Sequence, residues 1–341
     1  PDLQPALLYR EQLLASTAKE MDAMVKALEG GVVYPAPGGD PVLNPNVLPT
    51  GRNMYSINAE MTPNPRAWED GKRLAEATIK QYKSKHGEYP RKVSYTFWAG
   101  EFISTEGATL AQAFWMLGIE PVRDKQGRVM DLKLIPSEEL GRPRINVVVQ
   151  VSGQLRDIAG SCLRLLTDAV RLASESPDEA YPNYVASGTL LQEKTLMDKG
   201  VAPKEARKMS IMRVFGPVNS GYSTGILGYT ESSGSWEDEK EIAEGFLNNM
   251  GATYGDDENW GSFQKELFAS ALTETDVVIQ PRQSNTWGPI SLDHVYEFTG
   301  GLSLAVKTVT GKEPDAYMAD YRNRNNRRLQ EAKEAISVET R

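Results

Sequence analysis

The sequence is poor in the side chains that most often build metal centres and covalent cross-links. Its 341 residues contain one cysteine, Cys162, and two histidines, His86 and His294. A single cysteine excludes an internal disulfide framework, and two histidines exclude a multi-histidine metal site made from this chain alone. We expect Cys162, which lies inside an apolar helical pattern, to be an unreactive core residue.

Several classes of protein are excluded by other absences. No apolar run reaches the roughly 20 residues that a bilayer-spanning helix needs, and no N-terminal signal pattern is present. The phosphate-binding pattern G-x-x-x-x-G-K-[ST] is missing, so the piece shows no ATP chemistry of its own. A net charge of −8 argues against a general nucleic-acid binder. We therefore expect no nucleic-acid partner and no membrane span in this piece. The expected location is cytoplasmic, or membrane-associated through parts outside this chain.

The length and composition are those of a globular protein with an ample core. Hydrophobic residues make up 40% of the chain and charged residues 25%. The sequence begins at Pro1, which is not a natural start, and stops inside a helical pattern, so we expect a piece of a longer protein. We predict an N-terminal helix with a Pro/Gly-rich loop at 1–60, an α/β core at 61–319 and a basic helical tail at 320–341.

The most informative stretch is residues 92–117, which read KVSYTFWAGEFISTEGATLAQAFWML. The aromatic and β-branched run up to Trp98 predicts a buried strand, and the pattern from Gly107 onward predicts a helix. A polar turn containing Glu101 and Glu106 lies between them. In an open parallel sheet such a turn lies at the carboxyl end of a strand, where these sheets build their binding sites.

The same plan recurs along the chain. The runs RINVVVQVS at 144–152 and DVVIQ at 276–280 predict two further buried strands, each followed by polar residues. Such repeated crossovers favour a parallel sheet. We therefore predict an α/β fold with a mostly parallel sheet flanked by helices, and long Pro/Gly-rich loops at the strand ends. The polar residues that would meet at one edge are Glu101, Glu106, Arg156, Asp157, Arg282, Gln283 and Trp287.

The remaining patterns predict elements around this core. Helices are expected at 5–29, 65–85, 107–117, 153–174, 188–209, 237–250, 262–272 and 295–308, with a hairpin in 120–136 and a short strand at 211–215. The segment 34–53, YPAPGGDPVLNPNVLPTGRN, predicts neither helix nor interior strand. It is either a surface linker or an ordered binding loop that ends in Arg52 and Asn53, and both interpretations stay open.

Longer strings of this sequence resemble those of a known family. The strings include PAPGGDPVLNPNVLPTGRN, the stretch 92–117, ELGRPRINVVVQVSGQLRD, RVFGPVNSGYSTGI, SGSWEDEKEIAEGFLNNMGATYG and VYEFTGGLSLAV. In this order they resemble the large subunit of the cobaltochelatase and magnesium chelatase family, over about residues 10–340. The resemblance implies a protein that binds a tetrapyrrole and inserts a metal, with ATPase chelatase subunits as partners. It also extends to a branch that is implicated in the reverse process, the removal of iron from haem.

Departures from the family pattern concern groups that accept protons. Ala108 stands where the family usually has a glutamate after T-E-G. Thr299 stands where it has a histidine before the paired glycines Gly300-Gly301, and His294 lies five residues earlier. Their loss disfavours ordinary metal insertion and favours action on a ring that already holds its metal. The resemblance implies a tetrapyrrole, either haem or a metal-free porphyrin or corrin precursor, and a divalent metal, which is Fe, Co or Mg.

The chemistry of metal exchange selects the candidate site residues. Protons must leave or reach the pyrrole nitrogens, and a buried carboxyl or a histidine can carry them. The candidates for this role are Glu106, Glu101 and His294, and Glu106 and His294 are also the candidate metal ligands. Arginine suits the ring carboxylates and tryptophan suits the flat ring. The candidate tetrapyrrole contacts are Arg52, Asn53, Trp98, Arg156, Trp236, Arg282, Gln283 and Trp287.

Each candidate also has a structural alternative. Glu106 would charge the first turn of a helix, and Arg156 would form an ion pair with its neighbour. Arg52 and Asn53 would anchor their loop, His294 would cap a helix, and the tryptophans would pack in the core. For the whole protein, the alternative to a metal chelatase or dechelatase is a non-catalytic tetrapyrrole (haem) carrier or sensor.

Overall fold

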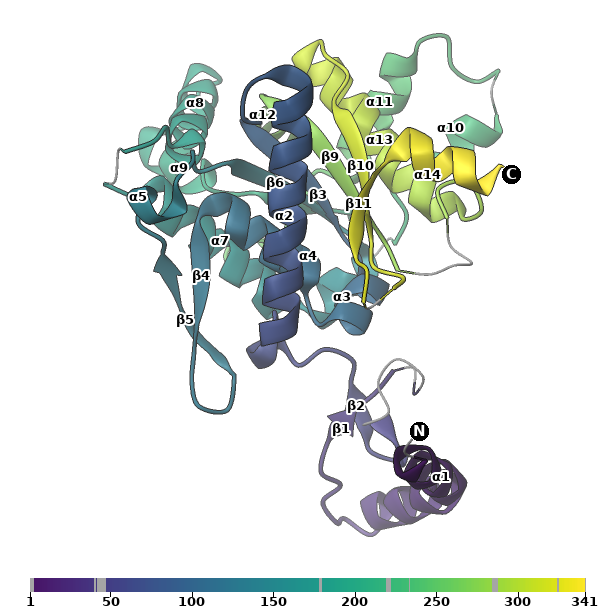
Figure 1. The fold of residues 1–341 in the computed structure, drawn as a ribbon. Helices are drawn as coiled ribbons and strands as arrows, with labels where there is room; N and C mark the ends of the chain where they lie inside the picture. Colours follow the sequence, from purple (N-terminus) through teal and green to yellow (C-terminus); the bar gives the residue numbers. More distant parts are fainter. Residues whose placement is uncertain are drawn as a thin grey trace. The chain divides into compact units, whose positions relative to one another are not determined.

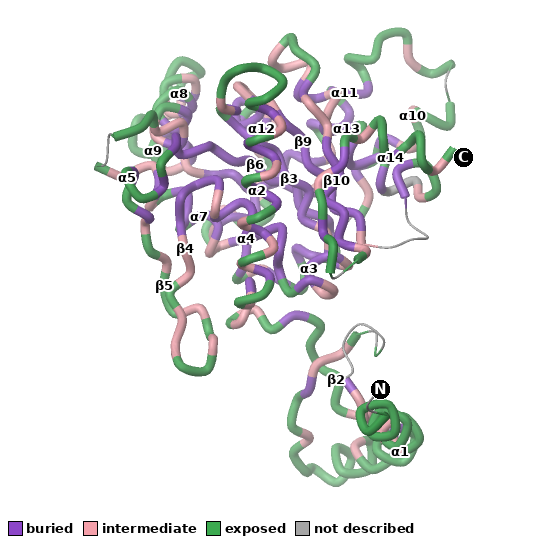
Figure 2. The backbone as a smooth tube through the Cα atoms, viewed as in Figure 1, coloured by how far each residue is buried: buried purple, intermediate pink, exposed green. Residues whose placement is uncertain are grey.

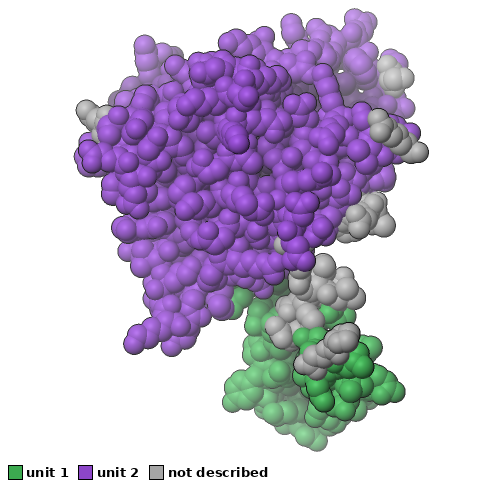
Figure 3. Space-filling view, viewed as in Figure 1, with its two compact units in different colours: residues 1–59 green, residues 60–341 purple. Residues whose placement is uncertain are grey.

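The chain divides into two compact units (Figure 3), Pro1–Ala59 and Glu60–Arg341. The structure is a computed structural model that describes residues 3–39, 41, 47–177, 180–218, 222–232, 234–283, 288–323 and 325–340. The side chains of Asp293 and His294 lie outside this description. The smaller unit contains one long helix, and the larger unit contains the main sheet.

The smaller unit consists of this helix and a loop that returns to it. α1 spans Gln4–Leu28, as predicted. Among its described residues, the Pro/Gly-rich segment forms strand structure in a two-stranded parallel ladder, made by β1 (Ala36–Pro37) and β2 (Asn53–Tyr55). None of these residues belongs to the seven-stranded sheet, so the prediction of no interior strand is confirmed for this part of the segment. Most large apolar side chains of α1 are exposed, and Figure 2 shows this along the whole helix.

The larger unit is built on a seven-stranded sheet with the order β11-β10-β9-β3-β6-β7-β8 (Figure 1). The five inner strands run parallel, and the two edge strands, β11 and β8, run antiparallel to their neighbours. The predicted mostly parallel α/β fold is confirmed. The strands are β3 (Lys92–Phe97), β6 (Asn146–Val151), β7 (Val214–Gly216), β8 (Ala252–Thr253), β9 (Thr275–Arg282), β10 (Asp315–Asp320) and β11 (Arg328–Glu331).

Helices cover both faces of this sheet, which explains why its inner strands read as nearly continuous apolar runs. Every residue of β3 and β6 is buried. One face carries α2 (Pro65–His86), α4 (Ala108–Leu117) and α7 (Gly160–Ser174), and the other carries α11 (Glu239–Asn249), α12 (Lys265–Leu272) and α13 (Asp293–Thr310). Cys162 is buried in α7, where burial raises the pKa of its thiol to about 12, so the prediction of an unreactive core cysteine is confirmed.

Shorter elements complete the described chain. They are η2 (Ala59–Met61), α3 (Ala99–Thr105), β4 (Ile119–Arg123), β5 (Val129–Leu134), α5 (Ser137–Leu140), α6 (Gly153–Ile158), α8 (Tyr184–Asp198), α9 (Pro203–Met209), α10 (Leu227–Glu231) and α14 (Ala332–Glu339). The hairpin of β4 and β5 lies where it was predicted.

The helix predicted for the basic tail is wrong for residues 328–331. They form β11, which pairs with β10, and only residues 332–339 are helical. An edge strand tolerates charged side chains because one side of it faces solvent, so the basic composition did not exclude a strand. β10 itself was not predicted.

The strand order places a topological switch beside β3. In chain order the parallel strands are β3, β6, β7, β9 and β10, so across the sheet the first strand lies between the second and the fourth. From β3 the chain passes to the face of α4, and from β9 it passes to the face of α13. Sheets of this order bind ligands in the crevice outside the carboxyl ends of the two strands at the switch. The candidate site is therefore at the ends of β3 and β9.

The paired glycines of α13 have different surroundings, and this difference tests the packing of the helix. A Cβ at Gly301 would lie 2.4 Å from Cδ2 of Phe246 in α11, whereas a Cβ at Gly300 would meet no described atom within 4 Å. We expect Gly301→Ala to lower the free energy of unfolding by about 1–3 kcal/mol through overpacking. Gly300→Ala should raise it by about 0.5–1 kcal/mol, because alanine favours a helix. Urea denaturation measures both changes, and equal effects at the two positions would contradict this packing.

Candidate functional site

The loops after β3 and β9 meet at the carboxyl edge of the sheet, as the sequence predicted. The side-chain nitrogen of Gln283, which follows β9, lies 2.9 Å from the place that a Cβ on Gly100 would occupy. Gly100 belongs to the first turn of α3, directly after β3. The end of β6 joins the same edge, since the backbone nitrogen of Ser152 donates to the carbonyl of Phe97 at 3.0 Å.

Glu101 is completely buried at this edge. It lies in the first turn of α3 and is 0% exposed. Its Oε1 accepts hydrogen bonds from the hydroxyl of Thr105 at 2.5 Å and from the backbone nitrogen of Thr109 at 3.2 Å. Because Gly107 at the N-cap of α4 has no side chain, Glu101 supplies the acceptor that this helix start needs. The other oxygen, Oε2, has no hydrogen-bond partner among the described residues.

Burial changes the acidity of this carboxyl. Loss of hydration raises the pKa of Glu101 from 4.5 to about 7, and hydrogen bonds from Thr105 and Thr109 oppose the rise only in part. A carboxyl with this pKa exists in both protonation states near neutral pH, so it can give up a proton and take one back. Glu101 therefore has the acidity that proton exchange with a bound ligand requires.

A line of hydrogen bonds connects Glu101 to the end of β10. The side-chain amide of Gln112 donates to the hydroxyl of Tyr321 at 2.6 Å, and this hydroxyl lies 3.0 Å from Oγ1 of Thr109. The backbone nitrogen of Thr109 in turn donates to Glu101. Sequence reasoning missed Tyr321, because β10 was not recognised and its end was not assigned to the edge.

A second buried carboxylate, that of Glu297 in α13, is held by the loop after β7. Its Oε1 accepts hydrogen bonds from the hydroxyls of Ser223 and Thr224, each at 2.5 Å, and from the backbone nitrogen of Thr224. The carboxylate is 0% exposed. Three donors on one oxygen give Glu297 a structural role, whereas Glu101 keeps one oxygen unpartnered within the described part of the chain. Glu297 was also missed, although it lies in the string VYEFTGG.

Glu106 lies apart from Glu101. It is exposed and forms the C-cap of α3 in the left-handed conformation, with φ +60°. Its carboxylate accepts a hydrogen bond from the side-chain amide of Asn64, the N-cap residue of α2. It therefore ties the turn to α2, and the more deeply placed Glu101 becomes the leading candidate for the proton carrier.

Two predicted arginines are engaged with acidic residues of the chain. Arg156 is buried, and its Nε donates to Asp157 at 2.8 Å, which is the ion pair that the sequence offered as an alternative. The guanidinium also lies over the ring of Tyr254, 5.4 Å from its centre. Arg282 is buried and pairs with Glu339 of α14 at 2.6 Å.

The predicted tryptophans differ in position. Trp98 is half-buried at the end of β3 and makes an edge contact with Phe298 of α13, with ring centres 5.1 Å apart. Trp236 is half-buried and donates from Nε1 to the carbonyl of Tyr229 at 2.9 Å. Trp287 and the side chain of His294 lie outside the described residues. Of the described candidate tryptophans, Trp98 is thus the one at the topological switch between β3 and β9.

The two candidate residues of the loop in the smaller unit, Asn53 and Arg52, differ in what they contact. The side-chain amide of Asn53 donates to the carbonyls of Pro37 and Val47, at 2.5 and 2.9 Å, so it anchors the loop. Arg52 lines a hollow against α1.

Within the described residues no three His, Cys, Asp or Glu side chains are grouped to hold a metal ion. None of the described helices is both long enough and apolar enough to cross a membrane.

Comparison with known proteins gives the site its context. A family model described as CobN/Magnesium Chelatase matches residues 3–341. The chain belongs to the CobN/magnesium chelatase family. It is 33% identical over 308 residues to the aerobic cobaltochelatase subunit CobN of a Sinorhizobium species, covering 90% of this chain and 24% of that protein. It is 32% identical over 304 residues to the chloroplastic magnesium-chelatase subunit ChlH of Oryza sativa subsp. indica, covering 88% and 21%.

A solved structure agrees with this membership. The catalytic subunit of cobaltochelatase from Mycobacterium tuberculosis superposes with a TM-score of 0.79 at 31% identity, covering 95% of this chain and 27% of that one. The chain thus spans about a quarter of the length of these CobN and ChlH relatives.

In this CobN/magnesium chelatase family chain, the block ELGRPRINV closes helix α4. Nη2 of Arg142 donates to the carbonyl of Trp115 at 2.6 Å. Arg144 donates to the carbonyl of Gly118 at 3.0 Å and to that of Ile135 at 2.5 Å. The last carbonyls of a helix have no partner inside it, so these buried guanidinium groups replace the missing donors. The block fixes α4, whose first turn donates a hydrogen bond to Glu101 of α3.

The departure from the family pattern at Ala108 lies in that first turn. Ala108 is fully buried, and its carbonyl lies 2.6 Å from the place that a Cβ on Gly71 of α2 would occupy. α2 and α4 therefore approach closely at this point. Between β3 and α4 the carboxyl groups are those of Glu101 and Glu106.

The raised pKa of Glu101 predicts a pH dependence of stability. The folded protein keeps this proton up to about pH 7, whereas the unfolded chain loses it near pH 4.5. The stabilisation is therefore complete below pH 4.5 and is lost as the pH rises through 7, on the order of 3 kcal/mol in all. Urea denaturation of the wild type and of Glu101→Gln, followed across this range, measures the difference. Parallel curves would show that Glu101 has ordinary acidity.

Proposed function

We propose that the full-length protein is a chelatase-type large subunit that exchanges the metal of a porphyrin- or corrin-type ring. In this proposal Glu101 carries the proton. One observation supports it above the others, namely a fully buried carboxyl beside the topological switch, with one oxygen unpartnered among the described residues. Family membership supplies the substrate class, since the named relatives are cobaltochelatase and magnesium-chelatase subunits.

Metal exchange on a tetrapyrrole is also proton exchange. When a divalent metal enters the ring, two pyrrole N–H protons leave, and when the metal leaves, two protons return. The neutral form of Glu101 donates such a proton, and the ionised form accepts one. Both forms are populated near neutral pH because the pKa of the carboxyl is about 7. The hydrogen bonds that Glu101 accepts from the hydroxyl of Thr105 and from the backbone nitrogen of Thr109 stabilise the ionised form.

We further propose that the favoured direction is removal, with ferrous haem as the substrate. In that direction one haem and two protons give one free-base ring and one Fe²⁺ ion. Ala108 and Thr299 stand where the resemblance has a glutamate and a histidine, so two proton acceptors that insertion would use are missing. More than half of Glu101 is protonated at any pH below its pKa of about 7, and this suits the delivery of protons.

Tetrapyrrole contact is proposed for the residues at the same edge. Trp98 offers an aromatic face beside the end of β3, and Gln283 lies across from it near Gly100. Aromatic side chains pack well on flat π systems. Trp236 and Arg156 are weaker candidates, because the chain already engages their polar groups. Arg282 pairs with Glu339 through Nη2, while its Nε and Nη1 have no hydrogen-bond partner among the described residues.

The proposal is tested by assaying the full-length protein in both directions. Ferrous haem is incubated under anaerobic conditions with a colorimetric chelator of Fe²⁺, and free-base porphyrin is incubated with Co²⁺ or Mg²⁺, each with and without ATP and ATPase chelatase subunits. Conversion of the haem spectrum to the free-base spectrum with release of iron supports removal. Metal uptake alone would reverse the direction. A bound spectrum that never changes would identify the alternative, a tetrapyrrole carrier.

A further inference from the structure

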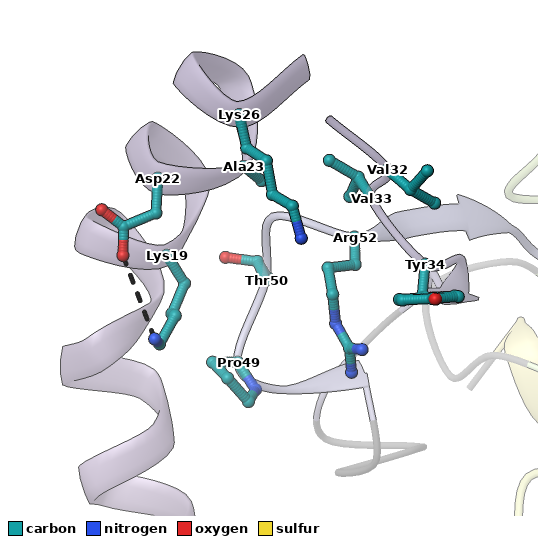
Figure 4. A pocket seen from close by; sticks show the side chains of 10 residues that line it. All are labelled: Lys19, Asp22, Ala23, Lys26, Val32, Val33, Tyr34, Pro49, Thr50 and Arg52. Carbon is teal, nitrogen blue, oxygen red and sulfur yellow. Dashed lines mark ion pairs between the residues drawn. The ribbon is translucent and has the colours of Figure 1, made fainter. Parts of the chain in front are cut away.

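The smaller unit contains a cationic hollow that the site in the larger unit does not use. Figure 4 shows it between α1 and the end of the Pro/Gly-rich segment. Its volume is about 250 Å³. The cations that line it are Lys19, Lys26 and Arg52, and its apolar wall consists of Ala23, Val32, Val33, Tyr34 and Pro49. Among the described residues of the lining the single acid is Asp22, which forms an ion pair with Lys19 at 3.9 Å.

The hollow is formed by a docked loop. The backbone nitrogen of Thr50 donates to the hydroxyl of Ser16 at 3.0 Å, and its own hydroxyl donates to Glu20 at 2.5 Å. Gly51 has φ +108°, and a Cβ there would lie 2.7 Å from the carbonyl of Lys19, so only glycine fits. These contacts hold residues 49–52, PTGR, against α1. They fix the backbone that carries Arg52.

The charges around the hollow are unbalanced. Lys26 of α1 and Arg52 of the loop both line the hollow, and Figure 4 shows both side chains. Within the described residues no carboxylate lies within ion-pair distance of either one. A planar guanidinium can donate two parallel hydrogen bonds to one carboxylate, and a nearby ammonium adds a second positive charge. Tyr34 and Pro49 offer apolar surface to the carbon atoms that carry such a carboxylate.

We propose that this hollow binds the carboxylate of a small organic acid, with Arg52 as the bidentate donor and Lys26 as the second cation. Its volume lies below the roughly 300–1,000 Å³ of sites that enclose a drug-sized molecule. It therefore accepts a short acidic arm or a free dicarboxylate, while a tetrapyrrole ring would stay outside. The first of these sources, an acidic arm of the ring, rests on the proposed function. The second does not.

The test measures binding to the full chain in three forms: wild type, Arg52→Gln and Lys26→Gln. Arg10→Gln is the matched control, since Arg10 is an exposed cation of α1 that does not line the hollow. The probes are glutarate and inorganic phosphate, followed by calorimetry, and a porphyrin with carboxylate side chains, followed by fluorescence. We expect Arg52→Gln to weaken carboxylate binding about tenfold or more, Lys26→Gln to weaken it less, and Arg10→Gln to leave it unchanged.

The outcomes separate the two sources and the two proposals. Weakened binding of glutarate supports a free acid, and weakened binding of the porphyrin alone supports an acidic arm of the ring. Preference for phosphate, or affinities that Arg52→Gln leaves unchanged for both carboxylate probes, would overturn the inference. If that variant still exchanged metal normally, the proposed function would survive this loss. If the wild type bound glutarate through Arg52 but bound no porphyrin, the hollow would stand and the proposed function would not.

Discussion

Replacing Glu101 by glutamine is expected to slow metal exchange on a tetrapyrrole by about 100-fold or more, because positioned acid–base groups contribute roughly 10²–10⁴-fold to a rate. Glutamine keeps a carbonyl oxygen that can accept the hydrogen bonds of Thr105 and Thr109, so the start of α4 stays capped. It has no proton to exchange near neutral pH. The rate with full-length protein, measured from pH 5 to pH 9 alongside circular dichroism, shows whether activity falls while the fold remains.

Glu106→Gln is the matched control for this prediction. Glu106 lies five residues further along, at the C-cap of α3, but it is exposed and its carboxylate bonds to Asn64. Glutamine preserves an acceptor for that amide, so we expect little change in rate. A large loss in Glu106→Gln with normal activity in Glu101→Gln would return the proton-carrying role to Glu106.

Replacing Trp98 by alanine is expected to weaken tetrapyrrole binding by about tenfold or more. The comparison is with nucleic-acid bases, for which one stacked aromatic side chain is worth about 1–3 kcal/mol. Trp98 is half-buried at the end of β3, and Phe298 holds one side of its ring. Trp98→Phe should keep most of the affinity, because a flat apolar ring remains. Fluorescence titration with a free-base porphyrin measures the dissociation constants of both variants.

Trp115→Phe controls for a general effect of losing a tryptophan. Trp115 lies near the C-terminal end of α4, where its Nε1 donates to Glu76 at 2.6 Å. This position is at the other end of the helix from the turn that carries Glu101. We expect unchanged porphyrin affinity in the folded variant. If Trp98→Ala bound porphyrin as tightly as the wild type, the ring would have to lie away from the end of β3.

The core of the fold was predictable because its strands are short apolar runs that end in polar turns. The segments 92–97 and 146–151 read this way, and both are central parallel strands. The segment 315–320, DAYMAD, has only four apolar or aromatic residues between two aspartates, and the basic residues after it resembled a helical tail. Tertiary pairing with β9 makes this segment a strand, and local sequence carries little of that information.

The location of the candidate site was predictable from the sequence. Which of its two glutamates is the better proton carrier was not. Glu101 and Glu106 look alike in the sequence. The seven-residue helix α3 separates them, because it turns Glu101 inward at its first turn and leaves Glu106 at its left-handed end. The surroundings that raise the pKa of Glu101 come from distant parts of the chain. Thr109 of α4 lies 8 residues further along, and Tyr321 at the end of β10 lies 220 residues further along. The ion pair of Arg156 was predictable because its partner is the next residue.

The most direct test of the central claim follows the absorbance spectrum of ferrous haem with time, in the presence of the full-length wild type or of Glu101→Gln. We expect the wild type to convert the haem Soret band to the free-base pattern with release of Fe²⁺. We also expect Glu101→Gln to bind haem with the same affinity and to leave the spectrum of the bound haem unchanged. Equal rates of conversion by the two proteins would contradict a role for Glu101 as proton carrier.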